Sequence, residues 1–394
     1  MKKIDQYHTL DVLFFERPVV DLRKFAFKIA KCLKSFDENI RLGAVCIEFP
    51  ERNETTYVDH FYHRDSITDI DEFLTRSGVK VIVFTNYRVP DIEFILHAKK
   101  LGIKTVMIQE GVMFDGMNIN DVTVSNIISV VGGYFGKALS YINMMRNMCK
   151  YDGRSFANLL ATLLKDRKNI THVIARSFSE HLICDYVLTM GRYWDDYYVN
   201  QVGYKKEQIR LIGDHDLDDF TVSANNEHAI CYIANVLVED GTVKKEDFLS
   251  FIETFAKAVD KKTKIYIKLH PRSDQSLYKA FEGHNVEFMR KTGALPSTTV
   301  YVGHRSALLG RALYESDNLI IWRFANEEVC FYERFATAVC TNKDELLSAL
   351  SSIDIGKVTN EKRDEIESVY WKNPQGAIYS AAEIIHDYYN NQRV

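Results

Sequence analysis

The strongest constraint on the fold is the alternation of short β-branched or aromatic runs with longer amphipathic stretches. Such alternation is typical of βαβ units built around a parallel sheet. In the first half of the chain we expect strands at 43–49, 81–85, 105–109, 172–175 and 186–189, and helices at 22–33 and 91–101. This half is therefore predicted to form one doubly wound α/β unit.

The same pattern returns after a polar stretch at 223–227, with strands expected at 229–233, 264–269, 299–302 and 319–322 and helices at 245–259 and 306–314. A chain of 394 residues is too long for one ordinary core. We predict two domains, residues 1–222 and 223–394, with a terminal helix at 376–389 that could cross back to the first. Two Rossmann-like domains facing a central cleft form the GT-B fold, an α/β class in which ligands bind at the carboxyl ends of the strands.

Composition limits the cellular setting and the partners. Hydrophobic residues make up 46% of the chain and charged residues 26%, as in ordinary globular proteins, and the net charge of -4 argues against a nucleic-acid partner. The seven cysteines are scattered and never form C-x-x-C, which favours reduced thiols in a cytoplasmic protein without a zinc site. The start of the chain makes a poor signal peptide, and the apolar stretch 127–145 is interrupted by glycine and lysine, so we expect no membrane span.

The sharpest local signal is a buried-looking strand followed at once by His270 and Pro271. Proline ends the hydrogen-bond ladder and fixes the turn, which places the imidazole at the carboxyl edge of the sheet. A histidine there can donate a hydrogen bond or a proton to a departing phosphate. A histidine that merely ends a strand fits the position equally well.

A second signal is the acidic pair Glu239 and Asp240, which precedes Gly241 and follows the first strand of the same half. A carboxylate in such a loop can take a proton from an acceptor hydroxyl. A solvated acidic turn that opens the next helix is the alternative, and it is the commoner use of such a sequence.

A third signal is Arg305 and Ser306, which lie between an expected strand and an expected helix. Backbone N–H groups, a hydroxyl and a guanidinium at a helix start can hold a phosphate. An ordinary serine N-cap explains Ser306 equally well.

Taken in order, these three segments resemble the acidic-acidic-Gly, His-Pro and Ser motifs of bacterial sialyltransferases of the GT-B type, nearest to the lipooligosaccharide sialyltransferase and polysialyltransferase group. The resemblance covers residues 229–316, whereas the first half resembles capsule and teichoic-acid glycosyltransferases only in general layout. It departs from the family pattern at Arg305, because the family often has paired hydroxyl residues at that motif.

The resemblance implies an inverting, metal-independent transfer of sialic acid or a related nonulosonic acid from a CMP-activated donor to an oligosaccharide or glycolipid acceptor. In that reaction Asp240 is the expected general base, with Glu239 as the substitute, and His270 stabilises or protonates the leaving phosphate. Ser306 is expected to bind that phosphate. The remaining expected donor contacts are Gly241, Lys268, Pro271, Arg272 and Arg305.

The first domain is expected to bind the acceptor. Glu110 follows the strand at 105–109 and is a candidate acceptor contact, although a turn centred on Gly111 explains this segment too. Two D-x-D sequences, 69–71 and 214–216, offer the oxygen ligands that divalent metals prefer. We predict a metal at neither, and no cofactor.

Alternatives remain open on sequence grounds. A CDP-glycerol or polyol-phosphate transferase, a transferase using UDP-sugar or CMP-Kdo, and a non-catalytic glycan-binding protein of the same fold all fit the pattern. The basic amphipathic stretch 137–168 could also lie on an anionic membrane surface, where a lipid-linked acceptor is found, or be a helix with a solvated face.

Overall fold

The structure is a computed structural model, and it describes residues 7–15, 25–46, 57–85, 89–111, 142–165, 177–178, 183–218, 221–290, 294–325, 329–354 and 361–391. The chain divides into two compact units. The first unit contains residues 1–215 and 372–394, and the second contains residues 216–371. The sequence had suggested one boundary after residue 222, whereas the chain passes between the units at two places.

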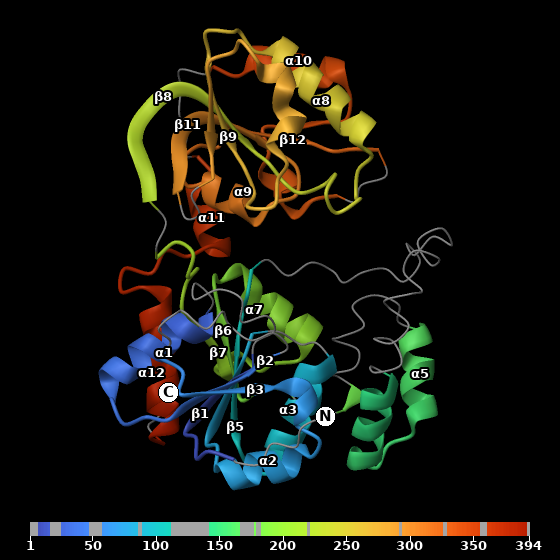
Figure 1. The fold of residues 1–394 in the computed structure, drawn as a ribbon, viewed down its shortest axis with the longest axis vertical. Coiled ribbons are helices and arrows are strands. Elements are labelled where there is room, and N and C mark those ends of the chain that lie inside the picture. The colour runs from blue at the N-terminus through green and yellow to red at the C-terminus, as the bar shows by residue number, and fades with distance from the viewer. Residues whose placement is uncertain are drawn as a thin grey trace. The chain divides into compact units, whose positions relative to one another are not determined.

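The first unit is built on a seven-stranded sheet in which every strand pair is parallel (Figure 1). Its strands lie in the order β3-β2-β1-β4-β5-β6-β7. They are β1 (Val12–Phe15), β2 (Leu42–Cys46), β3 (His60–His63), β4 (Val81–Phe84), β5 (Lys104–Ile108), β6 (Tyr186–Thr189) and β7 (Ile209–Leu211). The direction of winding reverses between β1 and β4, as in a Rossmann-like sheet.

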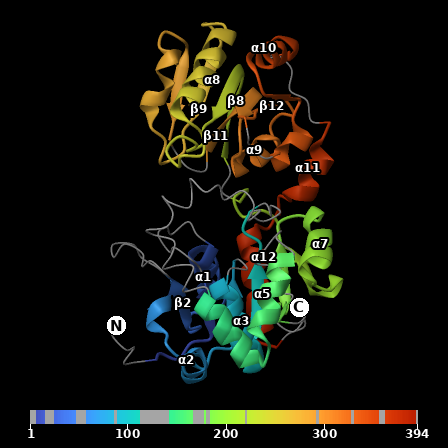
Figure 2. The same ribbon diagram turned by 90° about the vertical axis from the view of Figure 1, so that its right-hand side faces the viewer.

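Helices cover both faces of this sheet because its strands are apolar on both sides. Helices α1 (Phe25–Phe36) and α12 (Ala377–Tyr389) pack together on one face (Figures 1 and 2). Helices α2 (Ile70–Ser77) and α3 (Val89–Lys100) use the other face, where the ring of Phe94 lies 4.7 Å from that of Phe15. The first unit also contains the helical residues 142–152 and the helices α5 (Phe156–Lys165) and α7 (Tyr193–Tyr197). The terminal helix thus belongs to the first unit's core.

The second unit has a six-stranded parallel sheet in the order β10-β9-β8-β11-β12-β13. The strands are β8 (Thr221–Ile233), β9 (Lys264–Lys268), β10 (Val286–Met289), β11 (Ala294–Gly303), β12 (Leu319–Trp322) and β13 (Ala338–Cys340). Helices α8 (Lys245–Ala258) and α10 (Lys343–Ser352) bury one face with a cluster of phenylalanines. Helices α9 (Ala307–Ala312) and α11 (Arg363–Val369) lie toward the other side (Figure 1).

The regular pattern located the long elements well. The expected strands 186–189 and 319–322 coincide with β6 and β12, and the expected helix 245–259 differs from α8 by one residue. The expected strand 172–175 lies outside the described residues. The sequence did not single out β1, β3, β10 or β13, although β6 and β12 are equally short and were recognised. A run of three or four residues carries little alternation, so its prediction depends on the segments around it. In the described ranges, no helix combines the length and apolarity needed to cross a membrane.

Candidate active site at the edge of the second sheet

Three turns lie side by side at the carboxyl edge of the second sheet. They follow β8, β9 and β11, which are neighbours in the order β9-β8-β11 and run parallel. We call them the 239–241, 270–274 and 305–306 turns. The carboxyl ends of parallel strands share one edge, so the fold brings the three sequence motifs together, and this edge is where α/β proteins bind ligands.

An ion pair joins the first two turns. The Arg272 guanidinium donates two hydrogen bonds to the Asp240 carboxylate, at 2.7 Å from Nη1 to Oδ1 and 3.2 Å from Nη2 to Oδ2. The backbone N–H of Asp274 donates to Glu239 Oε1 at 2.7 Å. The Arg272 and Asp240 side chains are 62% and 43% exposed, so water screens the pair and a ligand can compete for either partner.

The same turn fixes the tautomer of His270. Its Nδ1 accepts a hydrogen bond from the backbone N–H of Arg272 at 3.2 Å, so the proton of the neutral ring lies on Nε2. Burial lowers the pKa of His270, and the Arg272 charge lowers it further, against the opposite effect of Asp240 and Glu239. His270 is therefore a neutral hydrogen-bond donor near pH 7.

Asn235 links the third turn to the first. This residue follows β8, its Nδ2 donates to the carbonyl oxygen of Arg305, and its Oδ1 accepts from the N–H of Val236 at 2.8 Å. Ser306 Oγ accepts from Leu308 N at 3.3 Å and caps α9, so the capping role is real and leaves its O–H able to donate. Asn235 was not anticipated, although a polar residue directly after a buried strand is a usable signal.

The other expected donor contacts lie in the same region with different exposure. Gly241 has φ of +70°, a left-handed conformation that favours glycine, and Pro271 is exposed in its turn. Lys268 is buried at the end of β9, and burial lowers the pKa of its amine. Arg305 is exposed, and its guanidinium has no acidic partner among the residues that the structure describes.

A buried histidine, His304, holds the strands of this sheet edge together through hydrogen bonds. His304 follows β11, its Nε2 accepts from the Tyr232 hydroxyl at 2.8 Å, and its Nδ1–H donates to the Trp322 carbonyl at 2.9 Å. Burial lowers the pKa of His304 to about 4. The ring is therefore neutral, and it joins the ends of β8, β11 and β12 through hydrogen bonds that the sequence alone did not suggest.

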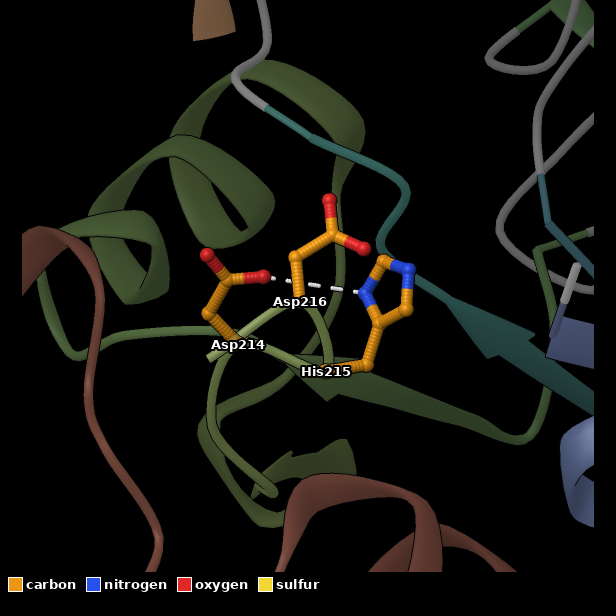
Figure 3. Close-up of side chains that lie close together, drawn as sticks. All are labelled: Asp214, His215 and Asp216. Carbon is orange, nitrogen blue, oxygen red and sulfur yellow. Dashed lines mark ion pairs between the residues drawn. The ribbon is translucent and has the colours of Figure 1, made fainter. Parts of the chain in front are cut away.

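Both D-x-D sequences have structural partners. Asp69 caps α2 by accepting from Glu72 N at 2.9 Å. The ligand atoms of Asp214, His215 and Asp216 lie within 4.8 Å of one another, close enough to share a cation. Figure 3 shows the three side chains side by side. However, the guanidinium of Arg311 lies 2.6 Å from Asp216 and already neutralises that carboxylate.

Glu110 belongs to the first unit, whereas the 239–241 and 270–274 turns belong to the second. It directly follows β5, so it lies at the carboxyl edge of the first sheet, and it is half-buried. Gly111 next to it has φ of +76° and makes the turn.

Comparison with known proteins adds the family. A model of the alpha-2,8-polysialyltransferase (POLYST) family matches residues 38–291, more than half of the chain. The chain belongs to this family. It is therefore a glycosyltransferase, and the match includes the 239–241 and 270–274 turns but ends before Arg305 and Ser306. A search of curated proteins finds no match.

Solved structures share the fold of this family member. One is the wall teichoic acid polymerase TagF soaked with CDPG, with a TM-score of 0.55, 12% identity, and coverage of 98% of this chain and 91% of that chain. Another is a putative UDP-N-acetylglucosamine 2-epimerase from Listeria monocytogenes, with a TM-score of 0.53, 11% identity and 98% coverage of both chains. At identities this low, the likeness shows the fold alone. It confirms the predicted GT-B class.

Proposed function

We propose that this family member transfers sialic acid or a related nonulosonic acid from a CMP-activated donor to a bacterial surface glycan of the capsule or lipooligosaccharide kind, inside the cytoplasm. The observation that carries the proposal is the pairing of the 239–241 and 270–274 turns by Arg272, which places a carboxylate and a neutral histidine at one sheet edge. Membership in the polysialyltransferase family supports the choice of donor.

The proposed reaction is a single inverting displacement. Asp240 takes the proton of an acceptor hydroxyl while that oxygen attacks the anomeric carbon, and the bond from this carbon to the CMP phosphate oxygen breaks. His270 Nε2–H donates to the departing phosphate, and the Ser306 hydroxyl and Arg305 add further donors. Glu239 is the less available base because its carboxylate already accepts from Asp274 N.

Arg272 connects donor binding to the base. The phosphodiester of a CMP-activated donor carries one negative charge and can accept the same two guanidinium hydrogen bonds as a carboxylate, and the Arg272–Asp240 pair is exposed. The donor phosphate would therefore compete with Asp240 for Arg272, and the dianion that forms as CMP departs would hold the guanidinium more strongly, which frees the base as the reaction proceeds.

We also propose that the reaction needs no metal. Arg311 neutralises Asp216, and the Asp69 carboxylate caps a helix, so both D-x-D sequences have uses of their own. Chelation with EDTA should then leave transfer unchanged. A loss of activity restored by a divalent cation would contradict this part of the proposal.

A donor screen tests the function. We expect CMP release from CMP-sialic acid, and we expect His270→Ala to slow it by about 10² to 10³, as for loss of one well-placed donor to a developing anion. His228→Ala, at an exposed position of β8, is the matched control and should keep full activity. Transfer of glycerol phosphate from CDP-glycerol, or use of UDP-sugar or CMP-Kdo alone, would overturn the donor assignment. Glycan binding without release of nucleotide from any donor would indicate a binding protein.

We further propose a peripheral membrane contact through α5. Leu160 and Leu164 lie one turn apart on this helix, are 37% and 69% exposed, and adjoin the basic Lys165. Apolar side chains beside a cation favour an anionic lipid surface. The protein should sediment with phosphatidylglycerol vesicles at low salt, and Leu164→Glu should abolish this. Equal sedimentation of both proteins, or of neither, would contradict the contact.

A further inference from the structure

A hollow lined by both polar and apolar side chains lies wholly within the first unit. It has a volume of about 730 Å³ and lies beside the carboxyl end of β3. Its wall comes from the 3-10 turn Arg64–Ser66, the start of α2, one side of α3 and the helical residues 143–151. We call it the α2–α3 hollow, and none of the residues discussed for donor chemistry lines it.

Most of the charges in this wall are paired with one another. Arg64 Nη2 lies 2.5 Å from Glu93 Oε2, and these side chains are only 11% and 6% exposed. Asp71 accepts from the Tyr151 hydroxyl at 2.8 Å and lies 2.6 Å from His97 Nδ1. Two further lining residues, Asp69 and Lys150, carry opposite charges. The hollow therefore presents a polar surface with little net charge.

Several polar groups of the wall remain available to a ligand. The exposed side-chain amides of Asn143 and Asn147 line the hollow and lack a partner within the described part of the chain. Each amide offers two donor hydrogens and an acceptor oxygen to a ligand hydroxyl. Arg64 Nε also has no acceptor among the described residues, but it is fully buried and out of a ligand's reach.

We infer that the α2–α3 hollow binds a neutral, hydroxyl-rich sugar unit of the acceptor glycan. Hydroxyl groups both donate and accept, which suits a wall of carboxylates, amides and a guanidinium, while Ile67, Ile70 and Met144 offer apolar contact to the C–H face of a sugar ring. An anionic sugar finds no strong partner at Arg64, because the guanidinium is already paired with Glu93. This inference rests on the proposed transferase function and specifies the neutral part of its acceptor.

Binding by the full-length chain tests the inference directly. The probes are lactose, a neutral disaccharide, and a trimer of sialic acid, each followed by saturation-transfer NMR. Asn147→Trp fills the hollow from an exposed helix position, and Ile142→Trp adds the same ring on that helix outside the lining. We expect lactose to bind the wild type and Ile142→Trp alike and to bind Asn147→Trp about ten-fold more weakly. Equal lactose binding in both variants, no lactose binding at all, or binding of the trimer alone at this site would overturn the inference.

Kinetics separate this inference from the donor proposal. With a lactose-containing acceptor, Asn147→Trp should raise KM about ten-fold and leave kcat unchanged, as expected when binding common to ground and transition states is lost. CMP release in the absence of acceptor should equal that of wild type. If the wild type uses no CMP donor, the proposed function fails while the lactose result still decides the hollow. If donor turnover is normal and the variant transfers like wild type, the hollow alone is wrongly assigned.

Discussion

The edge of the second sheet and the α2–α3 hollow of the first unit are both polar, but they are built differently. At the sheet edge, each candidate group lies in the turn or loop that follows a buried strand: Asn235 and Asp240 after β8, His270 after β9, and Ser306 after β11. The hollow draws its wall from a strand-end turn and three helical segments that lie far apart in the chain. A site at strand ends can therefore be recognised from sequence, whereas a site between helices cannot.

Their ion pairs also differ in exposure. The Arg272–Asp240 pair of the edge is 62% and 43% exposed, whereas the Arg64–Glu93 pair of the hollow is 11% and 6% exposed. An exposed pair opens at little cost, while breaking a buried pair leaves an uncompensated charge. The edge is suited to changes of partner during a reaction, and the hollow to a fixed shape.

The largest expected effect sharpens this contrast. Asp240→Asn should lower transfer by about 10² to 10⁴, because a neutral amide cannot take the acceptor proton. Asp71→Asn, an equally small change in the hollow, should affect KM for the acceptor and leave kcat close to wild type. Steady-state kinetics on both purified variants measure the difference. Equal losses of kcat would contradict the proposal that the sheet edge performs the reaction and the hollow binds the acceptor.

The next effect concerns the contribution of the buried His304 to the stability of the second unit. Because the folded-state pKa of His304 is about 4, against an unfolded value of 6.5, the unfolded chain binds more protons between these values. The stability that this neutral histidine contributes is complete above pH 6.5 and falls by about 3 kcal/mol as the pH drops toward 4.

Hydrogen exchange of the β12 amides at several pH values measures this loss. His304→Gln keeps a donor and an acceptor but does not titrate, so its protection should depend less on pH between 6.5 and 4. A variant with the same pH dependence as wild type would show that His304 does not govern it.

A packing change gives a smaller effect, confined to the second unit. A Cβ at Gly310 would lie 2.3 Å from Tyr370 Cε2 and would clash with this buried ring. The hydroxyl of Tyr370 is also hydrogen-bonded to that of Tyr332, which limits how far the ring can move. Gly310→Ala should therefore cost about 1 to 3 kcal/mol through overpacking. Gly283→Ala, with φ of +83° and open space, is the control for backbone strain alone. Thermal unfolding measures both variants. Equal losses of unfolding free energy would mean that the Tyr370 ring moves aside at little cost.

The smallest effect compares helix caps in the two units. Asp69 caps α2 beside the hollow, and Asn342 caps α10 in the second unit, each by accepting an N–H three residues on. Replacing either with alanine should cost about 1 kcal/mol of unfolding free energy. Only Asp69→Ala should also alter lactose binding, because only Asp69 lines the hollow. Unchanged lactose binding would remove Asp69 from the site while leaving its capping role.

The prediction of individual elements was uneven. Residues 319–322 were placed correctly, whereas β1, which also has four buried apolar side chains in a row, and the partly exposed β3 were not recognised. The helix α12 was grouped with the second half as one that could cross back to the first, and it packs on α1. Local hydrophobic pattern says that a segment is buried. It does not say which partner buries it.

By itself, the sequence determined the two parallel α/β halves and the His-Pro turn, because hydrophobic periodicity and the fixed φ of proline act within a few residues of the chain. Only the tertiary structure decided the rest. The order β9-β8-β11 is not the order of the chain, and it is this order that brings Arg272 to Asp240 and Asn235 to Arg305. The tautomer of His270 and the α2–α3 hollow likewise follow from contacts between segments, and long-range packing alone chooses among those contacts.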